Sequence, residues 1–368
     1  MSTAVISDTH LGRLNGGDVL RHPVARARLL ETLGDVDRLV LMGDVLELRE
    51  FRSAKAVRLS EPVFRDLGDA LPTDAEVVLV PGNHDYLLAG PIFRRVPRRR
   101  LALEQKTPVD AHGELGALAK AVAPSRLTIA YPGLWLRPDV YATHGHWLDA
   151  HAGGPRFERR VIGALRRCLP LPEVARPYHY ERISAPLYAI AHLFLTGDGR
   201  VSGAGRVAAR ARRRSDGHSH DLNSPVRRTT GPGISTRFRP AAGVTGAADP
   251  SSPPVGGSRA RRPTTVDAMS EVVQRLQIAA DYVLFGHTHR AGPLPSDDGD
   301  AWREKQGPRL VNAGCWVYDK SFAGDEPGRS PYWPGRLVKL VDAGPPKLVG
   351  LLDDLPAETL TRQAPDAL

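Results

Sequence analysis

Short apolar runs that end at a polar turn recur along this chain of 368 residues. The clearest spans 77–86, where Val-Val-Leu-Val leads through a Pro-Gly turn into Asn83, His84 and Asp85. Such a run is typical of a buried strand that delivers functional groups to the carboxyl edge of a sheet. The glycine lets the backbone bend there because it has no Cβ atom. The alternative is a polar turn that only caps a helix.

Four further apolar runs end in the same way, which predicts strands at 3–7, 38–42, 140–143 and 281–285. Their ends carry Asp8, His10, Asp44, His144, His287 and His289. Residues i and i+2 of an extended chain point to the same side, so each Asp-x-His or His-x-His pair can reach one point. At the fourth junction a glycine directly follows His144, which favours this residue as a ligand and leaves His146 as a candidate for substrate contact.

Segments with apolar residues at helical spacing separate these strands, and further strands follow them. Helices are expected at 22–33, 54–71, 111–123 and 266–280, and strands at 309–316, 336–342 and 347–352. This alternation predicts an α/β fold, in which helices cover a sheet. The catalytic domain is expected to comprise residues 1–150 and 266–352.

Residues 151–199 differ in character and are expected to form a helical cap inserted into that domain. Residues 157–169 have the pattern of a basic amphipathic helix, and 183–195 are apolar on most sides. The alternative for 157–195 is a lid that grips an amphipathic substrate or contacts a membrane surface peripherally.

Residues 200–265 are rich in Arg, Gly, Pro and Ser and hold almost no aliphatic core-forming residues, so we expect this insert to be disordered. Residues 200–266 contain 13 Arg and 3 Asp and neither Lys nor Glu, a charge of +10. Since the whole chain carries +9, the remainder carries −1. A solvated linker is the default interpretation, and contact with nucleic acid through this insert is the alternative. The tail at 353–368 is expected to be loose.

The lengths of the apolar runs and the cysteine count exclude some classes of protein. No apolar run approaches the roughly 20 residues of a membrane helix. The first residues have neither a basic segment nor a long apolar segment, so no signal peptide is expected. Two cysteines make no disulfide framework, which favours a reducing, cytoplasmic location.

Together the five junctions supply imidazoles, carboxylates and an amide oxygen. This mixture suits two borderline divalent ions, for which we expect manganese, with iron or zinc as alternatives. A carboxylate has two oxygens, so one aspartate can bridge two ions about 3.5–4 Å apart. Such a pair of cations favours a phosphorylated small molecule as substrate.

The ordered motifs resemble those of the calcineurin-like metallophosphoesterases. They are Asp8-x-His10, Gly43-Asp44, Gly82-Asn83-His84-Asp85, His144-Gly145 and Gly286-His287-x-His289. The resemblance implies a four-layer α/β/β/α sandwich with two metals. One metal would be held by Asp8, His10, Asp44 and His289, and the other by Asp44, Asn83, His144 and His287.

The same resemblance implies hydrolysis of a phosphate mono- or diester by a hydroxide shared between the two ions. His84 would act at the leaving-group oxygen and Asp85 would orient it. Asn83, His146 and Arg290 are the candidates for substrate binding. A nucleic-acid phosphodiesterase is one alternative.

A second alternative is a UDP-2,3-diacylglucosamine-like pyrophosphatase, which Gly43-Asp44-x-x-Glu47, Gly286-His287-Thr288-His289-Arg290 and the apolar insert resemble. Those enzymes typically carry Arg where this chain has His84.

Overall fold

The computed structural model describes residues 1–49, 53–113, 115–152, 162–163, 165–196, 264–303 and 307–361. The predicted Arg-rich insert at 200–265 therefore lies outside the described residues except for 264–265, and so does the alternative that places nucleic acid on it. Of the predicted helix at 157–169, residues 157–161 and 164 lie outside the described residues. The alternative that places a membrane surface on 157–195 stays a prediction.

The described strands form one mixed sheet in the order β11-β10-β1-β2-β3-β5-β6-β7-β9-β8, and β4 pairs with β5. Their bounds are β1 Thr3–Ile6, β2 Arg38–Met42, β3 Glu76–Val80, β4 Glu104–Pro108, β5 Arg126–Arg137, β6 Val140–Thr143, β7 Tyr282–Phe285, β8 Ala291–Gly292, β9 Arg309–Ala313, β10 Arg336–Leu340 and β11 Lys347–Gly350. Strands β1, β2, β3 and the start of β5 are parallel, as are β6, β7 and β9.

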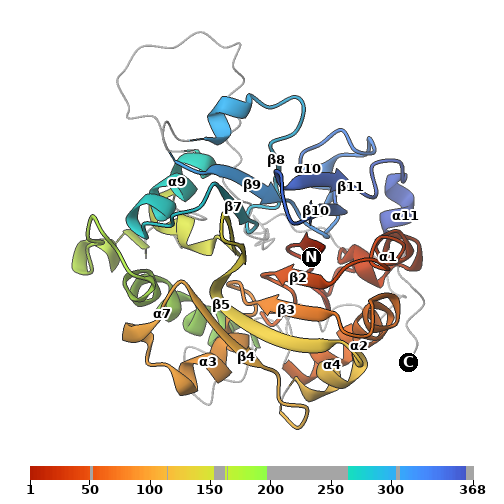
Figure 1. Ribbon diagram of the computed structural model, residues 1–368, viewed down its shortest axis with the longest axis horizontal. Coiled ribbons are helices and arrows are strands. Elements are labelled where there is room, and N and C mark those ends of the chain that lie inside the picture. Colours follow the sequence, from red (N-terminus) through yellow and green to blue (C-terminus); the bar gives the residue numbers. More distant parts are fainter. Residues whose placement is uncertain are drawn as a thin grey trace, which may run out of the picture.

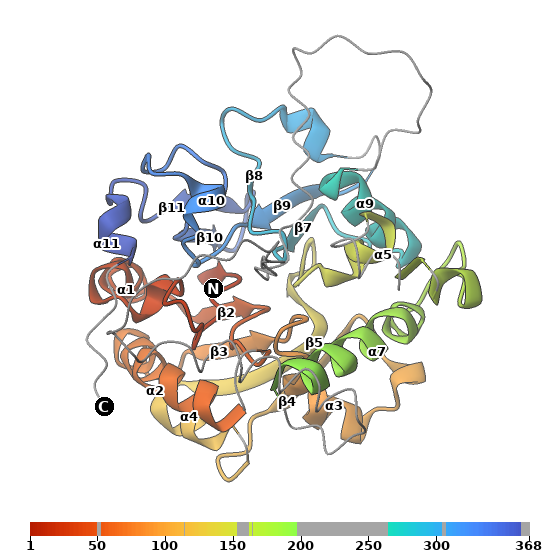
Figure 2. The same cartoon turned by 180° about the vertical axis from the view of Figure 1, so that it is seen from behind.

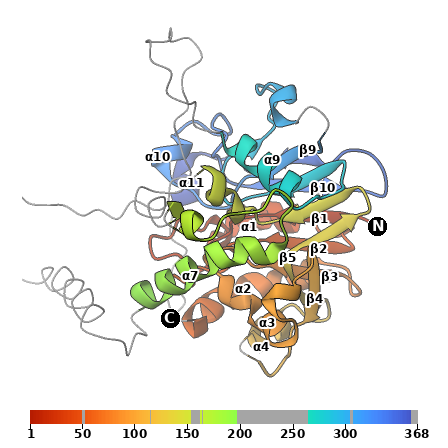
Figure 3. The same ribbon diagram turned by 90° about the vertical axis from the view of Figure 1, so that its left-hand side faces the viewer.

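The described α-helices are α1 Pro23–Leu30, α2 Ser53–Ala70, α3 Gly90–Arg95, α4 Gly116–Ala121, α5 Asp149–Ala152, α7 Pro177–Thr196, α9 Thr265–Arg275, α10 Lys320–Ala323 and α11 Ala357–Thr361. In Figure 1, α1, α2 and α4 lie on one side of the strands, and α7 and α9 lie on the other. Figure 3 shows α2, α3 and α4 below and α9 with β9 above.

The long strand β5 divides the sheet into two halves. Its start pairs with β3, and its end, from Gly133 onward, pairs with β6. A Cβ atom at Gly133 would overlap the carbonyl oxygen of Ala142, so only glycine permits this approach of the two strands. The two halves face each other across one apolar cluster, to which Val40 and Val78 contribute from the first half and Leu284 and Val311 from the second.

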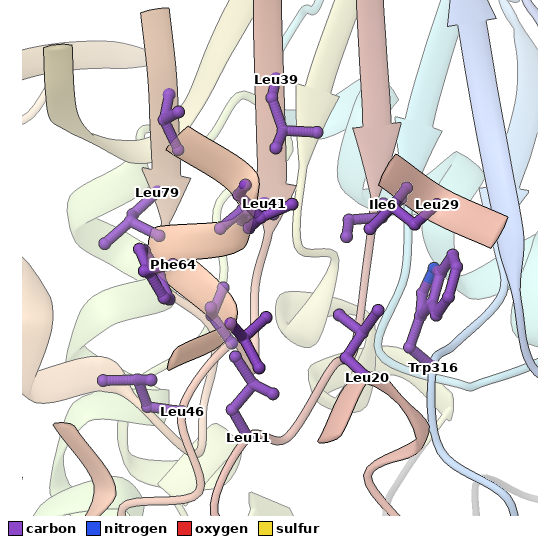
Figure 4. Close-up of a cluster of buried hydrophobic side chains, with 14 of the residues drawn as sticks. Ile6, Leu11, Leu20, Leu29, Leu39, Leu41, Leu46, Phe64, Leu79 and Trp316 are labelled. Carbon is purple, nitrogen blue, oxygen red and sulfur yellow. The ribbon is translucent and has the colours of Figure 1, made fainter. Parts of the chain in front are cut away.

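Helices cover the outer face of each half. One cluster buries α1, α2 and α4 against the first half, and another buries α5 and α9 against the second. In Figure 4, Phe64 of α2 lies beside Leu79, and Trp316 lies close to Leu29 and Leu20. These three apolar layers separate four structural layers, so the predicted α/β/β/α architecture is confirmed, with its two sheets joined into one through β5.

Among the segments that differ from the sequence-based expectations are strand β5 and the tail. Strand β5 was not predicted, because its Tyr131-Pro132-Gly133 stretch has the composition of a turn. The tail was expected to be loose from residue 353, but Leu360 of α11 is fully buried and Arg336 pairs with Asp353 at 2.7 Å. The apolar side of α11 packs into the core, which holds the tail as far as residue 361.

Helix α7 lies across the molecule near α3 and β5 (Figure 2). Its buried Glu181 accepts hydrogen bonds from the hydroxyl groups of Tyr86 and Tyr131. Tyr86 directly follows Asp85, so this contact links the helix to the turn after β3. Within the part of the chain that the structure describes, no helix combines the length and the apolar character needed to cross a membrane.

Candidate metal centre

The predicted ligands lie where the carboxyl ends of five strands meet. In the first half of the sheet, Ile6 of β1 pairs with Leu41 of β2, and Leu41 with Leu79 of β3. In the second half, Ala142 of β6 pairs with Leu284 of β7. This parallel register lets the residues that follow each strand emerge at one edge. The structure brings all seven predicted ligands together there.

Most of these residues have unusual backbone conformations. Six non-glycine residues of the described chain have positive φ angles, and five of them are predicted ligands: Asp8, His10, Asp44, His287 and His289, with φ from 44° to 69°. Left-handed backbone at a non-glycine residue costs about 1–3 kcal/mol and persists where the surroundings impose it. Its concentration at five positions of one cluster points to a functional site.

The first group of side chains contains Asp8, His10 and His289, whose ligand atoms lie within 4.8 Å of one another. Nε2 of His10 lies 3.2 Å from Nε2 of His289 and 3.7 Å from Oδ2 of Asp44. Oδ1 of Asp8 is buried and accepts no hydrogen bond within the described residues, although Nε2 of His289 lies 3.4 Å away. An unpaired buried carboxylate oxygen is costly unless a cation binds it.

The second group contains Asp44, His144 and His287, again within 4.8 Å. The side-chain oxygen of Asn83 joins them at 3.1 Å from Nε2 of His144, 3.0 Å from Nδ1 of His287 and 3.2 Å from Oδ2 of Asp44. When Nε2 of His144 and Nδ1 of His287 carry no proton, four acceptor atoms face one another. This arrangement fits a bound cation, and without one the Asn83 amide would turn over to donate its NH₂ group.

The second ring nitrogen of three histidines lies near a fixed acceptor. Nδ1 of His10 lies 3.0 Å from Glu47, Nδ1 of His144 lies 3.3 Å from the carbonyl of Met42, and Nε2 of His287 lies 2.9 Å from Asp149. When this nitrogen carries the proton, the other nitrogen presents its lone pair to the centre. Metal-binding histidines have this arrangement, so these residues fit two divalent ions that share Asp44.

The electrostatics of the cluster favour positive charge. Burial opposes the charged form of His144, but attraction to Asp44 and Asp8 outweighs it and raises its pKa to about 9. Burial also opposes charge on His289, but attraction to Cys315 and Asp8 raises its pKa to about 10. Burial disfavours the ionised Asp44, yet the neighbouring histidines hold its pKa well below its usual range. The cluster thus attracts cations, either protons or metal ions.

His84 lies at the rim of the centre, and its hydrogen-bond partner is Glu47 and not the expected Asp85. Its side chain is 20% exposed, and its Nε2 lies 4.0 Å from Oδ2 of Asp44. Its Nδ1 lies 2.9 Å from both oxygens of Glu47. Asp85, expected to orient His84, instead accepts hydrogen bonds from the backbone amides of Gly82, Val45 and Leu46. Its carboxylate thus joins the turns after β2 and β3, because those amides have no strand partner.

The candidates for substrate binding differ in their surroundings. His146 is buried between Tyr131 and Tyr188, and both its ring nitrogens lack a hydrogen-bond partner among the described residues. The guanidinium of Arg290 is already occupied, because it pairs with Asp297 at 2.5 Å and stacks over the ring of Trp302. This pairing argues against the predicted contact between Arg290 and substrate.

Sequence reasoning gave no role to two acidic residues of the site. Glu47 stood in a quoted motif, and its position three residues after Asp44 was the available signal. Asp149 follows His144 by five residues, but nothing in the sequence indicates that it reaches His287. Asn312 of β9 donates hydrogen bonds to the carbonyl of Gly286 and to the hydroxyl of Thr288, and so holds the turn that carries His287 and His289.

One of the comparisons with known proteins identifies the family of this chain. The family model of the calcineurin-like phosphoesterases matches residues 1–214, more than half of the chain. No curated protein matches the sequence. Among solved structures, the crystal structure of a dimetal phosphatase from Danio rerio aligns with 97% of this chain and 98% of that chain, at 13% identity and a TM-score of 0.34, which is too weak a likeness to bear on the site. The chain belongs to the calcineurin-like phosphoesterase family, and it is therefore a metal-dependent hydrolase of phosphoester bonds.

Proposed function

We propose that this protein hydrolyses a phosphate ester of a small molecule at two divalent ions that share the Asp44 carboxylate. The observation that carries the proposal is the position of Asp44 between the two groups of ligand atoms. Its Oδ2 lies 3.7 Å from Nε2 of His10 on one side and 3.4 Å from Nε2 of His144 on the other.

The proposed ligand sets follow from these groups. Asp8, His10, Asp44 and His289 would hold one ion, and Asp44, Asn83, His144 and His287 would hold the other. When bound, the ions would supply Lewis-acid stabilisation of the phosphoryl oxygens and make a water molecule acidic enough to act near neutral pH. Manganese is our proposed metal, because the sets mix carboxylate and amide oxygens with imidazole nitrogens.

We propose that His84 protonates the leaving-group oxygen. Its ring is partly exposed at the rim, where a substrate can reach it. Hydrogen bonding of Nδ1 to Glu47 fixes the ring so that Nε2 faces the centre. A general acid placed in this way contributes about 10²–10⁴ to the rate. Asp85 supports the same turn through its backbone contacts.

The test compares the metal content and activity of Asp44→Asn with those of the wild type. After chelation and reloading with manganese, the wild type should hold close to two ions, as measured by mass spectrometry, and should hydrolyse p-nitrophenyl phosphate or its bis ester. Asp44→Asn should lose metal and activity together. Asp139→Asn is the control, because that carboxylate pairs with Arg137 between β5 and β6 and lies outside the ligand sets. Full activity of metal-free protein would refute the proposal.

A panel of substrates decides the ester class. Phosphomonoesters, phosphodiesters, nucleotide-sugar pyrophosphates and single-stranded RNA cover the alternatives that the sequence leaves open. Preference for a nucleotide-sugar pyrophosphate would favour the alternative of a UDP-2,3-diacylglucosamine-like pyrophosphatase. Preference for RNA would assign it to the phosphodiesterases of nucleic acids.

A further inference from the structure

Arg49 follows β2 by seven residues and reaches the centre beside Asn83. Its backbone amide donates to Oε1 of Glu47 at 3.1 Å. Its Nη2 atom lies 3.5 Å from the backbone oxygen of Asn83. The Nε atom is buried and has no hydrogen-bond partner among the described residues. The guanidinium is therefore held in place with donor capacity that its protein contacts do not use.

The same guanidinium faces a second donor. With the Asn83 oxygen turned toward His144, His287 and Asp44, the amide NH₂ group lies 2.9 Å from Nη2 of Arg49. Two donors at this distance do not satisfy each other. An acceptor bound next to both would satisfy them together, and an anionic oxygen would also balance the guanidinium charge. When the Asn83 oxygen binds a metal ion, the Asn83 NH₂ group and the Arg49 guanidinium therefore lack a shared acceptor, which a bound anion would supply.

We propose that Arg49 and the Asn83 amide together bind a non-bridging oxygen of the substrate's phosphoryl group, and that this contact makes the enzyme selective for phosphomonoesters. The inference rests on the proposed function and specifies its substrate class. A phosphomonoester carries three non-bridging oxygens and up to two negative charges, whereas a diester carries two such oxygens and one charge. Arg49 and the Asn83 amide therefore meet more acceptor oxygens and more negative charge in a monoester than in a diester. Arg290, the cation expected at the centre from sequence, is already paired with Asp297.

The experiment measures steady-state kinetics of Arg49→Gln and Arg49→Lys with p-nitrophenyl phosphate and its bis ester. Arg49→Gln should raise KM for the monoester and the inhibition constant of inorganic phosphate by about 10- to 100-fold, the loss expected for charge-assisted hydrogen bonds. The bis ester should be affected less. Arg49→Lys keeps the charge without the planar fork and should recover part of the affinity. Arg94→Gln is the matched control, because Arg94 is an exposed residue of α3.

A second measurement uses the wild-type protein and does not depend on the variants folding. Inorganic phosphate should protect Arg49, but not Arg94, from modification by phenylglyoxal, as read by peptide mass spectrometry. The proposal is overturned if Arg49→Gln leaves KM and phosphate inhibition within twofold of wild type, if both esters lose activity equally, or if phosphate gives Arg49 no protection. A wild type without phosphoesterase activity would refute the proposed function instead, while phosphate protection would still report on this anion site.

Discussion

Nδ1 of His84 lies 2.9 Å from the carboxylate of Glu47, and the same carboxylate lies 3.0 Å from Nδ1 of His10. One buried acidic group thus orients both a proposed metal ligand and the proposed general acid. The rings of His10 and His84 meet edge to face, with their centroids 4.6 Å apart. A change at Glu47 should therefore affect metal binding and proton transfer together.

Glu47→Gln should lower kcat by about 10- to 100-fold, because the His84 ring loses the carboxylate that orients it. It should also weaken metal binding, because His10 shares that carboxylate. Initial rates and competition with a chromogenic chelator measure the two effects. Glu76→Gln is the control, because Glu76 pairs with Arg38 at the starts of β3 and β2, away from the centre. Unchanged kcat and metal affinity would exclude the proposed role of Glu47.

Asp85→Ala should lower the free energy of unfolding by about 3 kcal/mol, because buried amides of Gly82, Val45 and Leu46 lose their acceptor at about 1 kcal/mol each. Urea unfolding followed by tryptophan fluorescence measures this loss. Asp74→Ala, which removes an exposed carboxylate, should change stability little. If Asp85→Ala kept wild-type stability, a structural role for this carboxylate would be excluded.

Asp149→Ala should weaken metal binding by about 10- to 100-fold, because the carboxylate 2.9 Å from Nε2 of His287 fixes the ring that binds the ion through Nδ1. Asp149→Asn retains an acceptor oxygen and should recover part of the affinity. Competition with a chromogenic chelator gives the dissociation constants without relying on catalysis. Equal affinities in wild type and Asp149→Ala would show that His287 needs no such support.

The buried Glu181 should make stability depend on pH. Burial raises its pKa above the ordinary 4.5, although Tyr131, Tyr86 and Arg98 favour the charged form. The native state therefore holds this proton more tightly than the unfolded chain does. Its contribution is fully present below pH 4.5 and is lost as the pH rises through the raised pKa.

This dependence can be isolated by comparison with Glu181→Gln, which cannot titrate. The free energy of unfolding of the wild type, relative to that of the variant, should fall as the pH is raised from about 4 to about 7. Urea unfolding at several pH values measures the difference. A difference that stays constant or grows with pH would contradict the raised pKa.

The residue types at the ends of five strands could be predicted from the local pattern of the chain. An apolar run that ends at a polar side chain next to a glycine indicates a strand, a turn and a functional group within about ten residues, so Asp44 and His144 could be placed without knowing the fold. Strand β5 could not, because its Pro132-Gly133 pair has the local composition of a turn. Its extended conformation depends on pairing with β3, β4 and β6, which lie elsewhere in the sequence.

By itself, the sequence determined which side chains gather at this edge, since parallel strands deliver their carboxyl ends to the same place. The tertiary structure decided which partner each side chain meets. Asp85 adjoins His84 in sequence, yet it bonds to backbone amides, and Glu47 takes the place expected for it. Arg290 follows His289 but is paired with Asp297, whereas Arg49 reaches Asn83. The physical reason is that short-range hydrogen bonds and ion pairs depend on distances of a few ångströms between segments that only folding brings together.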